Sequence, residues 1–247
     1  MRAIAALNIG LWALAATAVA GADAGSHLQL LLSAGYVGGC AYRCFLPVID
    51  IPRIALVDSP LSRVAIGRSV ATVAELCFAA QWAIALNRLA SPDHNPIIAA
   101  ASMAIVPLIV LAEVCSWYAV LTTRQRPHAA ENSLWGLSAA LVVAAMLAAG
   151  PRESTAFYSQ VIAGGALYVA FIFVYDVPMY WARWRADRAL ARNYLTVAGG
   201  WTDACRHPVV SYRWEDWKNE IPWMSLYFTF GVWSSIWLVY ASLPARH

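Results

Sequence analysis

The sequence predicts an all-α integral membrane protein, a polytopic bundle of about seven transmembrane helices. The chain of 247 residues is 61% hydrophobic and only 13% charged, whereas soluble domains average about 25% charged residues. Its mean hydropathy is +0.57. The apolar residues form long runs, each close to the roughly 20 residues that cross about 30 Å of hydrocarbon. The net charge of +3 comes mostly from the arginines of one loop, so it does not indicate nucleic-acid binding.

Seven apolar runs are predicted to span the bilayer, and we interpret residues 1–247 as one membrane domain. The first run also resembles a secretory signal peptide, because Arg2 precedes an Ala-rich core that ends in small residues. Retention of this run as a span is favoured over cleavage. Pro107 is expected to kink the fourth run. The runs are about Ala3–Gly21, His27–Pro47, Val64–Leu89, Ile97–Thr123, Asn132–Gly150, Thr155–Val177 and Pro222–Leu243.

The basic residues predict the orientation of the chain in the membrane, because cytoplasmic connections carry an excess of Lys and Arg. One side holds Arg2, Arg53, Arg63, Arg124, Arg126 and seven residues between runs 6 and 7, and the other holds Arg88, Arg152 and Arg246. This distribution predicts a cytoplasmic N-terminus and a C-terminus on the opposite side.

The connection over residues 178–221 is the only sizeable part predicted outside the bilayer, and it is too short for a separate domain. Within it, Met179–Leu195 combines several arginines with Trp181 and Trp184. This composition predicts an amphipathic helix lying on an anionic membrane surface. The Trp- and Arg-rich stretch 179–221 is also a candidate surface for a protein partner. Asp203, Cys205 and His207 offer metal-ligand atoms, but structural zinc sites use four ligands.

Two carboxylates inside apolar runs are the strongest indication of a functional site. Glu75 lies in the third run and Glu113 in the fourth, and the midpoint of their numbers falls in the polar turn 91–96. Two straight antiparallel helices would place both carboxylates at one depth, about 15 Å from the end opposite the turn. Because charge within a membrane is costly, such residues indicate function by default.

Further polar residues are predicted to share the cytoplasmic half of the bundle with these carboxylates. They are Arg43, Arg68, Trp117, Tyr118, His128, Glu131 and Asp176. Three interpretations remain open. In the first, Glu75, Glu113, His128, Glu131 and Asp176 bind a divalent metal, with iron, manganese or zinc as candidates; the order His128-x-x-Glu131 reverses the Glu-x-x-His motif of di-iron bundles.

The second interpretation is acid–base chemistry or proton coupling without a metal, since two carboxylates close together in a low-dielectric site do not both ionise cheaply. The third is structural: Glu75 pairs with Arg68, Glu113 pairs with Arg43, and these ion pairs hold the helices in register. The sequence has no phosphate-binding glycine loop and no nucleophile elbow. Its only lysine is Lys218, outside the predicted spans, which argues against a retinal protein.

These observations favour a small integral membrane enzyme with a cytoplasm-facing polar site, acting on a lipid or other apolar substrate. Glu75 and Glu113 are the candidate catalytic residues. Arg43 and Arg68 are expected to bind an anionic headgroup, with Trp117 and Tyr118 as further substrate contacts. A proton-coupled transporter that uses the same carboxylates, and a non-catalytic subunit of a membrane complex, are the alternatives.

Overall fold

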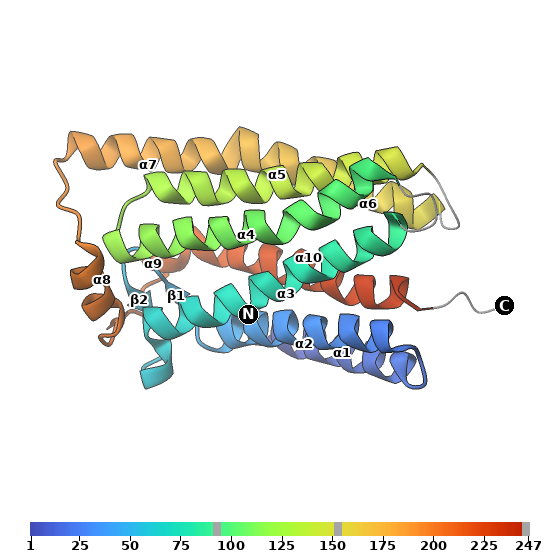
Figure 1. Ribbon diagram of the computed structural model, residues 1–247. Helices are drawn as coiled ribbons and strands as arrows, with labels where there is room; N and C mark the ends of the chain where they lie inside the picture. The colour runs from blue at the N-terminus through green and yellow to red at the C-terminus, as the bar shows by residue number, and fades with distance from the viewer. Residues whose placement is uncertain (91–94, 151–154, 244–247) are drawn as a thin grey trace. The chain divides into compact units, whose positions relative to one another are not determined.

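The computed structural model describes residues 1–90, 95–150 and 155–243, and it is almost entirely helical (Figure 1). Residues 91–94 of the predicted turn at 91–96 lie outside the described residues, and so do Arg152 and Arg246. In chain order the elements are α1 (Arg2–Val19), α2 (Ala24–Phe45), β1 (Val48–Ile49), β2 (Ile54–Ala55), η1 (Pro60–Ser62), α3 (Val64–Ala90), α4 (Pro96–Thr122), α5 (Arg126–Ala149), α6 (Thr155–Phe171), η2 (Ile172–Asp176), α7 (Val177–Ala189), α8 (Val197–Ala204), β3 (Val209–Val210), α9 (Trp214–Trp217) and α10 (Glu220–Ala241).

Six helical stretches among the described residues are long and apolar enough to cross a membrane. They are Arg2–Val19, Val64–Ala90, Pro96–Thr122, Arg126–Ala149, Tyr158–Ala189 and Glu220–Ala241. The predicted all-α class is therefore confirmed. The number of seven spans and insertion into a bilayer stay predictions. The second predicted run corresponds to α2, which has 22 residues but is less apolar because it carries Ser, His, Gln and several Gly residues.

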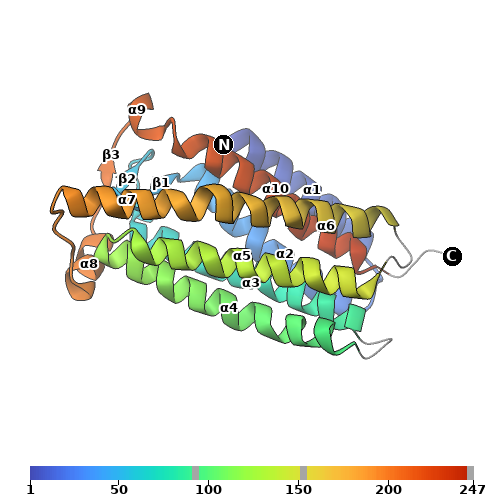
Figure 2. The ribbon, with the colours of Figure 1, turned by 90° about the horizontal axis from the view of Figure 1, so that it is seen from above.

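Two helices differ from the sequence-based prediction. α5 begins at Arg126, six residues before the predicted start, because Pro127 suits the first turn of a helix. The helix predicted to lie separately on the surface is instead the continuation of the sixth run. α6, η2 and α7 have 17, 5 and 13 residues and follow one another without a break (Figure 2). Together they form one helix about 50 Å long at 1.5 Å per residue.

A short three-stranded sheet was not predicted. β1 pairs antiparallel with β2, and β2 pairs parallel with β3. The strands have two residues each. They join the connection between α2 and α3 to the connection between α8 and α9.

The chain divides into two compact units. Unit 1 comprises Met1–Gln81 and Trp201–His247, and unit 2 comprises Trp82–Gly200. The division falls within α3. That the whole chain acts as one membrane domain stays a prediction.

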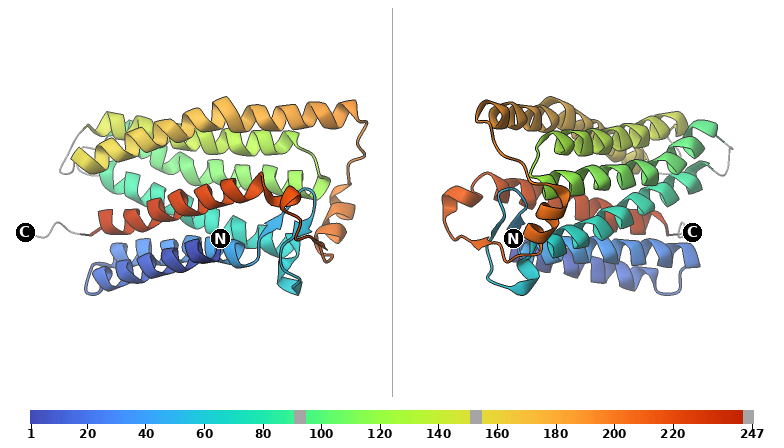
Figure 3. Two further views of the ribbon diagram at one scale, coloured as in Figure 1. Left: turned by 180° about the vertical axis from the view of Figure 1, so that it is seen from behind. Right: turned by 60° about the vertical axis from the view of Figure 1, so that its left-hand side comes forward.

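In unit 1, α1, α2 and α10 pack on one another (Figure 3), and two glycines bring α2 close to α3. A Cβ atom on Gly35 would lie 2.7 Å from the Cys77 Sγ, and one on Gly39 would lie 2.5 Å from the Ala74 Cβ. The spacing of four residues places both glycines on one face of α2. Small residues at this spacing allow helices in membranes to approach closely.

Four buried polar residues form what we call the glutamine clamp: Gln29 and Ser33 on α2, Gln81 on α3 and Ser235 on α10. The Gln29 side-chain amide donates to the Gln81 carbonyl at 3.0 Å, and the Gln81 amide donates to the Gln29 and Ser235 carbonyls at 3.2 Å each. The Ser235 hydroxyl donates to the Gln81 Oε1 at 2.5 Å and lies 3.0 Å from the Ser33 Oγ. All four side chains are fully buried, so the clamp ties three helices together.

α1 is bound into unit 1 by a second polar contact. The Asn8 side chain is 2% exposed and donates to the Phe228 carbonyl at 2.8 Å, while the Trp233 indole donates to the Asn8 Oδ1 at 3.1 Å. A signal peptide needs no such partner in the mature protein. The contact ties α1 to α10, and retention of α1 stays a prediction.

In unit 2, α4 and α5 form an antiparallel hairpin, and α6, η2 and α7 pack along α5 (Figures 1 and 2). α4 continues through Pro107; a kink there stays a prediction. The segment after α7 returns to the end of α4, where the Leu195 amide donates to the Thr122 carbonyl at 3.2 Å. At Gly200 the backbone lies so close to α4 that a Cβ atom would stand 1.8 Å from the Leu121 carbonyl oxygen.

Candidate carboxylate site of the α4–α5 hairpin

Glu113 of α4 and Glu131 of α5 face each other across the hairpin. Nine residues separate each from Thr122, the last residue of α4, and the connection to α5 is only three residues long, so the pairing follows from the chain geometry. Their carboxylate oxygens lie within 4.8 Å of each other, and the residues are 4% and 8% exposed. Two negative charges at this distance repel by about 3 to 4 kcal/mol at an effective dielectric constant of about 20. A proton, a metal cation or a cationic group near both oxygens offsets that cost.

His128 extends the site toward the end of the hairpin. Its Nδ1 hydrogen-bonds with the Glu131 Oε2 at 2.7 Å, as the spacing of three residues predicts. The Tyr180 ring of α7 also packs against the imidazole, with ring centroids 5.2 Å apart. His128 is half-buried. It therefore links the buried carboxylates to the helix end and fixes the orientation of Glu131.

Ser116 places a hydroxyl group close to Glu113, and this hydroxyl has no hydrogen-bond partner. It follows Glu113 by three residues, which places both on one face of α4. Ser116 is fully buried, and its Oγ has no hydrogen-bond partner. A buried hydroxyl is nearly always hydrogen-bonded in native proteins, so the Ser116 hydroxyl leaves an unused donor and acceptor on the Glu113 face.

Asp176 was predicted to join the same set, and the structure places it at the end of η2, four residues before Tyr180. Among the described residues, neither Asp176 nor His128 belongs to a group of three or more residues whose metal-ligand atoms all lie within 4.8 Å of one another. His128 instead contacts Glu131. Direct metal ligation by His128 or Asp176 stays a prediction.

Glu75 lies in unit 1, where the Arg68 Nη2 donates to its Oε1 at 3.3 Å. Arg68 is only 6% exposed. This is the ion pair that the structural interpretation predicted. It also leaves the predicted role of Arg68 in binding a headgroup with less support, because the guanidinium is buried and donates to a carboxylate of its own helix. That Glu75 and Glu113 share one site stays a prediction.

The structural interpretation predicted that Arg43 pairs with Glu113; within unit 1, Arg43 pairs with Asp50. Its Nη1 lies 3.9 Å from the Asp50 Oδ2, and its Nη2 donates to the Val48 carbonyl at 3.2 Å. Arg43 thus ties the end of α2 to β1 and the turn that follows, and a headgroup would have to compete with these contacts.

Trp117 and Tyr118 differ in their relation to the Glu113 face. Trp117 follows Glu113 by one helical turn and is half-buried, as a residue beside the site should be. Tyr118 is 42% exposed and lies on the outward side of α4. A substrate contact from Trp117 is compatible with this placement, whereas Tyr118 faces away from the buried carboxylates.

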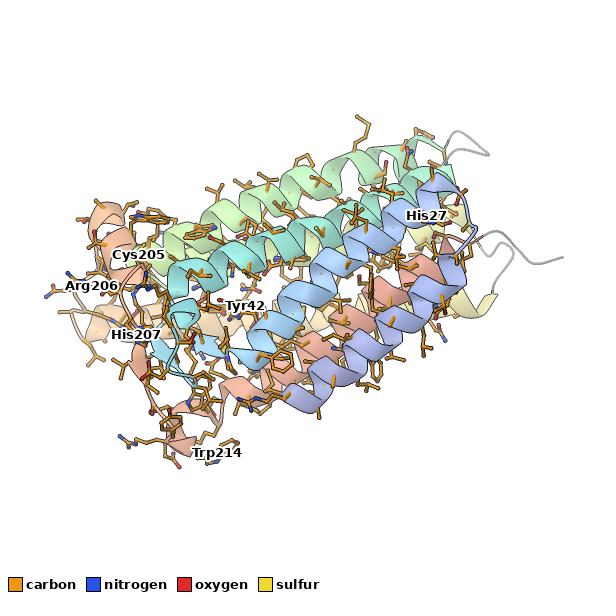
Figure 4. All side chains as sticks on the ribbon, turned by 90° about the horizontal axis from the view of Figure 1, so that it is seen from below. His27, Tyr42, Cys205, Arg206, His207 and Trp214 are labelled. Atoms are coloured by element: carbon orange, nitrogen blue, oxygen red, sulfur yellow. The ribbon has the colours of Figure 1, made fainter. Side chains whose placement is uncertain are left out.

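Cys205 and His207 lie at one end of unit 1 (Figure 4), just after Asp203 near the end of α8, and the carboxylate and imidazole of this triplet have separate partners. Asp203 pairs with Arg53, while the His207 Nε2 lies 3.1 Å from the Asp58 Oδ1. These ion pairs hold the loop before β3 against the connection that carries β2. The interpretation of the triplet as an ordinary loop stays a prediction.

The glutamine clamp was not predicted from the sequence. Gln29 and Gln81 are polar residues within apolar runs, and this signal could have identified them. The Gln29 Oε1 is buried without a hydrogen-bond partner, but the other bonds of the clamp join backbone and side chains of three helices, which indicates a structural role. No known protein family, curated protein or solved structure matches the chain.

Proposed function

We propose that the protein is an integral membrane enzyme that acts on a lipid or other apolar substrate at the carboxylate site of the α4–α5 hairpin. In this proposal Glu113 is the reacting acid or base, and Glu131, oriented by His128, is its partner. The orientation predicted from the basic residues turns the connection between α4 and α5 toward the cytoplasm, with Glu113 about 14 Å from the end of α4 at 1.5 Å per residue.

One observation carries the proposal: two buried carboxylates lie within 4.8 Å of each other in a helix pair apolar enough to span a membrane. Buried carboxylates are rare in such helices and line reaction or transport pathways. The unpartnered Ser116 hydroxyl supplies a further polar group beside them, and the His128 contact adds an imidazole, whose two nitrogens can donate and accept hydrogen bonds.

Two kinds of chemistry fit these residues. Without a metal, the carboxylate pair holds and transfers a proton, which one oxygen gives and the other receives. With a divalent metal, Glu113 and Glu131 are oxygen ligands of the kind that suits iron, manganese or zinc. His128 then orients Glu131 as an outer partner, as hydrogen bonds to ligands do in metal sites. Glu75 is the predicted third carboxylate in either version.

The experiment that tests enzyme function compares lipid composition before and after incubation. Purified protein is reconstituted with a total membrane lipid extract, and the lipids are analysed by mass spectrometry. Wild-type protein should convert one lipid class, and Glu113→Gln and Glu131→Gln should each lower the rate at least a hundredfold, in the range that removal of a general acid or base produces. Glu215→Gln is the matched control, because Glu215 lies outside the site and pairs with Lys218.

A rate that is equal in Glu113→Gln and Glu215→Gln would place the chemistry elsewhere. Metal analysis of the same preparations separates the two versions: a stoichiometric metal that is lost in Glu113→Gln supports the metal site, and its absence from wild-type protein ends it. Glu75→Gln tests the predicted third carboxylate in both assays.

A proton-coupled transporter is the second candidate, favoured by the order of the polar groups. Glu113 and Glu131 lie deepest in the hairpin, and Ser116 and His128 lie about one turn nearer its connection. Such series of polar groups carry protons in transporters. Flux into sealed liposomes that follows a pH gradient and stops in Glu113→Gln, with no lipid conversion, would decide for this candidate. Copurification with a partner and instability alone would instead indicate a complex subunit.

A further inference from the structure

Three arginines near the end of the α4–α5 hairpin lie against aromatic rings. We call this surface the arginine–aromatic face: Arg124, Arg126, Trp181, Trp184, Arg188 and Tyr194. The Arg126 Cζ lies 5.7 Å from the Trp181 centroid and 5.9 Å from the Trp184 centroid. The Arg188 Cζ lies 5.3 Å from the Trp184 ring, and the Arg124 Cζ lies 5.0 Å from the Tyr194 ring. These distances are within the range of cation–π contacts.

No carboxylate pairs with Arg124, Arg126 or Arg188 in the part of the chain that the structure describes. All three are exposed. The acidic residue nearest in sequence on α7 is Asp187, which is 8% exposed and accepts a hydrogen bond from Arg192 at 3.2 Å. By contrast, Arg43, Arg53 and Arg68 of unit 1 each pair with a carboxylate.

This difference points to a ligand with negative charge. A guanidinium that stacks on a ring keeps its N–H donors at its edge, and these donors match the oxygens of a phosphate in a bidentate fork. The rings hold the side chains of Arg124, Arg126 and Arg188 in place, which lowers the entropy that an incoming anion must offset.

The position of the face along the helices indicates that the phosphate belongs to a lipid. About 20 residues, counted from Thr155, cross the hydrocarbon layer, so the helix leaves this layer near Tyr175. Trp181 follows about 9 Å further at 1.5 Å per residue, at the level of the headgroups. Arg126 begins α5 at the same end of the hairpin. Tryptophan and tyrosine rings concentrate at this level of membrane proteins.

We propose that the arginine–aromatic face binds the phosphate of an anionic phospholipid headgroup. Arg124 and Arg126 hold the phosphate oxygens from the hairpin, Arg188 approaches from α7, and the indoles of Trp181 and Trp184 pack beside the upper acyl chain and glycerol. The proposal does not depend on the proposed function, because it concerns binding without turnover and can stand if the carboxylate site has another role.

The test measures lipid binding by native mass spectrometry of protein in detergent. Phosphatidylglycerol is titrated against phosphatidylcholine for the wild type, the Arg124→Gln/Arg126→Gln variant and Arg185→Gln. Arg185 is the matched control because it is exposed on α7 and contacts none of the rings. Each arginine near an anionic surface contributes a factor of roughly five, so the double variant should bind phosphatidylglycerol about 25-fold more weakly, while Arg185→Gln changes binding less than twofold.

A second variant keeps the test valid if the double variant does not fold. Arg126→Lys preserves the charge but removes the planar fork, and it should weaken phosphatidylglycerol binding a few fold without changing phosphatidylcholine binding. Equal affinities of wild-type protein for the two lipids, or an equal loss in Arg185→Gln and the double variant, would overturn the proposal. Displacement of phosphatidylglycerol by inorganic phosphate at similar concentration would overturn the assignment to a lipid.

Discussion

Replacement of Gln81 by Leu tests whether the glutamine clamp holds unit 1 together. The change removes three hydrogen bonds, two donated by the Gln81 amide and one accepted from Ser235. Leu fills nearly the same volume, so no large cavity opens. Interhelical polar contacts in membrane proteins average about 0.6 kcal/mol each. The loss of three such contacts should lower the free energy of unfolding by about 2 kcal/mol. For a chain of this size, this corresponds to a Tm lower by about 4 to 8 °C.

The assay is thermal unfolding in mild detergent, followed by the monodisperse fraction that remains after heating. Gln160→Leu is the matched control, because Gln160 is exposed on α6 and the chemical change is the same. Gln29→Leu should cost less than Gln81→Leu, since it removes a single donated bond and also a buried oxygen that has no partner. A Tm of Gln81→Leu no lower than that of Gln160→Leu would refute the structural role of the clamp.

Three further predictions concern close contacts and orientation. Gly39→Ala should destabilise the protein by about 1 to 3 kcal/mol, because the added Cβ overlaps α3. Gly38→Ala, with open space around it, should leave the Tm unchanged. Equal shifts in Tm for the two variants would refute the close approach of α2 to α3. Gly200→Ala should release the segment after α7 from the end of α4, seen as faster proteolysis there, since its Cβ would stand 1.8 Å from the Leu121 oxygen; unchanged proteolysis would contradict this contact. Lys218 should react with a membrane-impermeant amine reagent only after cells are opened, as the predicted cytoplasmic side of its loop requires; labelling of intact cells would reverse the orientation.

The ends of the long helices follow from sequence because polar turns interrupt long apolar runs. α3, α4 and α10 begin and end within about two residues of the predictions. The start of α5 was missed because Arg126 and His128 suggest a loop, while Pro127 and the packing of the hairpin extend the helix. The surface helix was misplaced for a similar reason: Arg and Trp residues indicate a membrane interface, but they do not say whether a helix lies along it or crosses it.

The inward face of each helix could not be predicted, and this limited the prediction of the site. In a soluble helix the buried face is apolar and the exposed face polar. A membrane helix faces lipid on its outside, so apolar residues appear on every face and Gln81 is not distinguished from Gln160. Sequence spacing alone identified the contact of Arg68 with Glu75, and the spacing of three residues places His128 and Glu131 on one face of α5. The pairing of Arg43 with Asp50 depends on the turn around β1, which no periodic pattern predicts.

The π-helix η2 gives the carboxylate site and the arginine–aromatic face a common structural origin. The Val177 amide bonds to the Ile172 carbonyl, five residues earlier, so η2 holds one residue more than an α-helical turn would. That extra residue rotates everything after it by about 100°. Gly136 of α5 leaves room for η2, since a Cβ atom on Gly136 would lie 2.8 Å from the Ile172 and Phe173 side chains.

Beyond η2, the rotated face of α7 presents Tyr180 to His128 and presents Trp181 and Trp184 to Arg126. An uninterrupted α-helix would carry a different set of residues to α5, and both contacts would be lost together. Helical insertions of this kind are frequent at functional sites, because one extra residue re-aims a whole helix face without breaking the helix. In this chain the same rotation supports the histidine that orients Glu131 and assembles the rings that hold the exposed arginine.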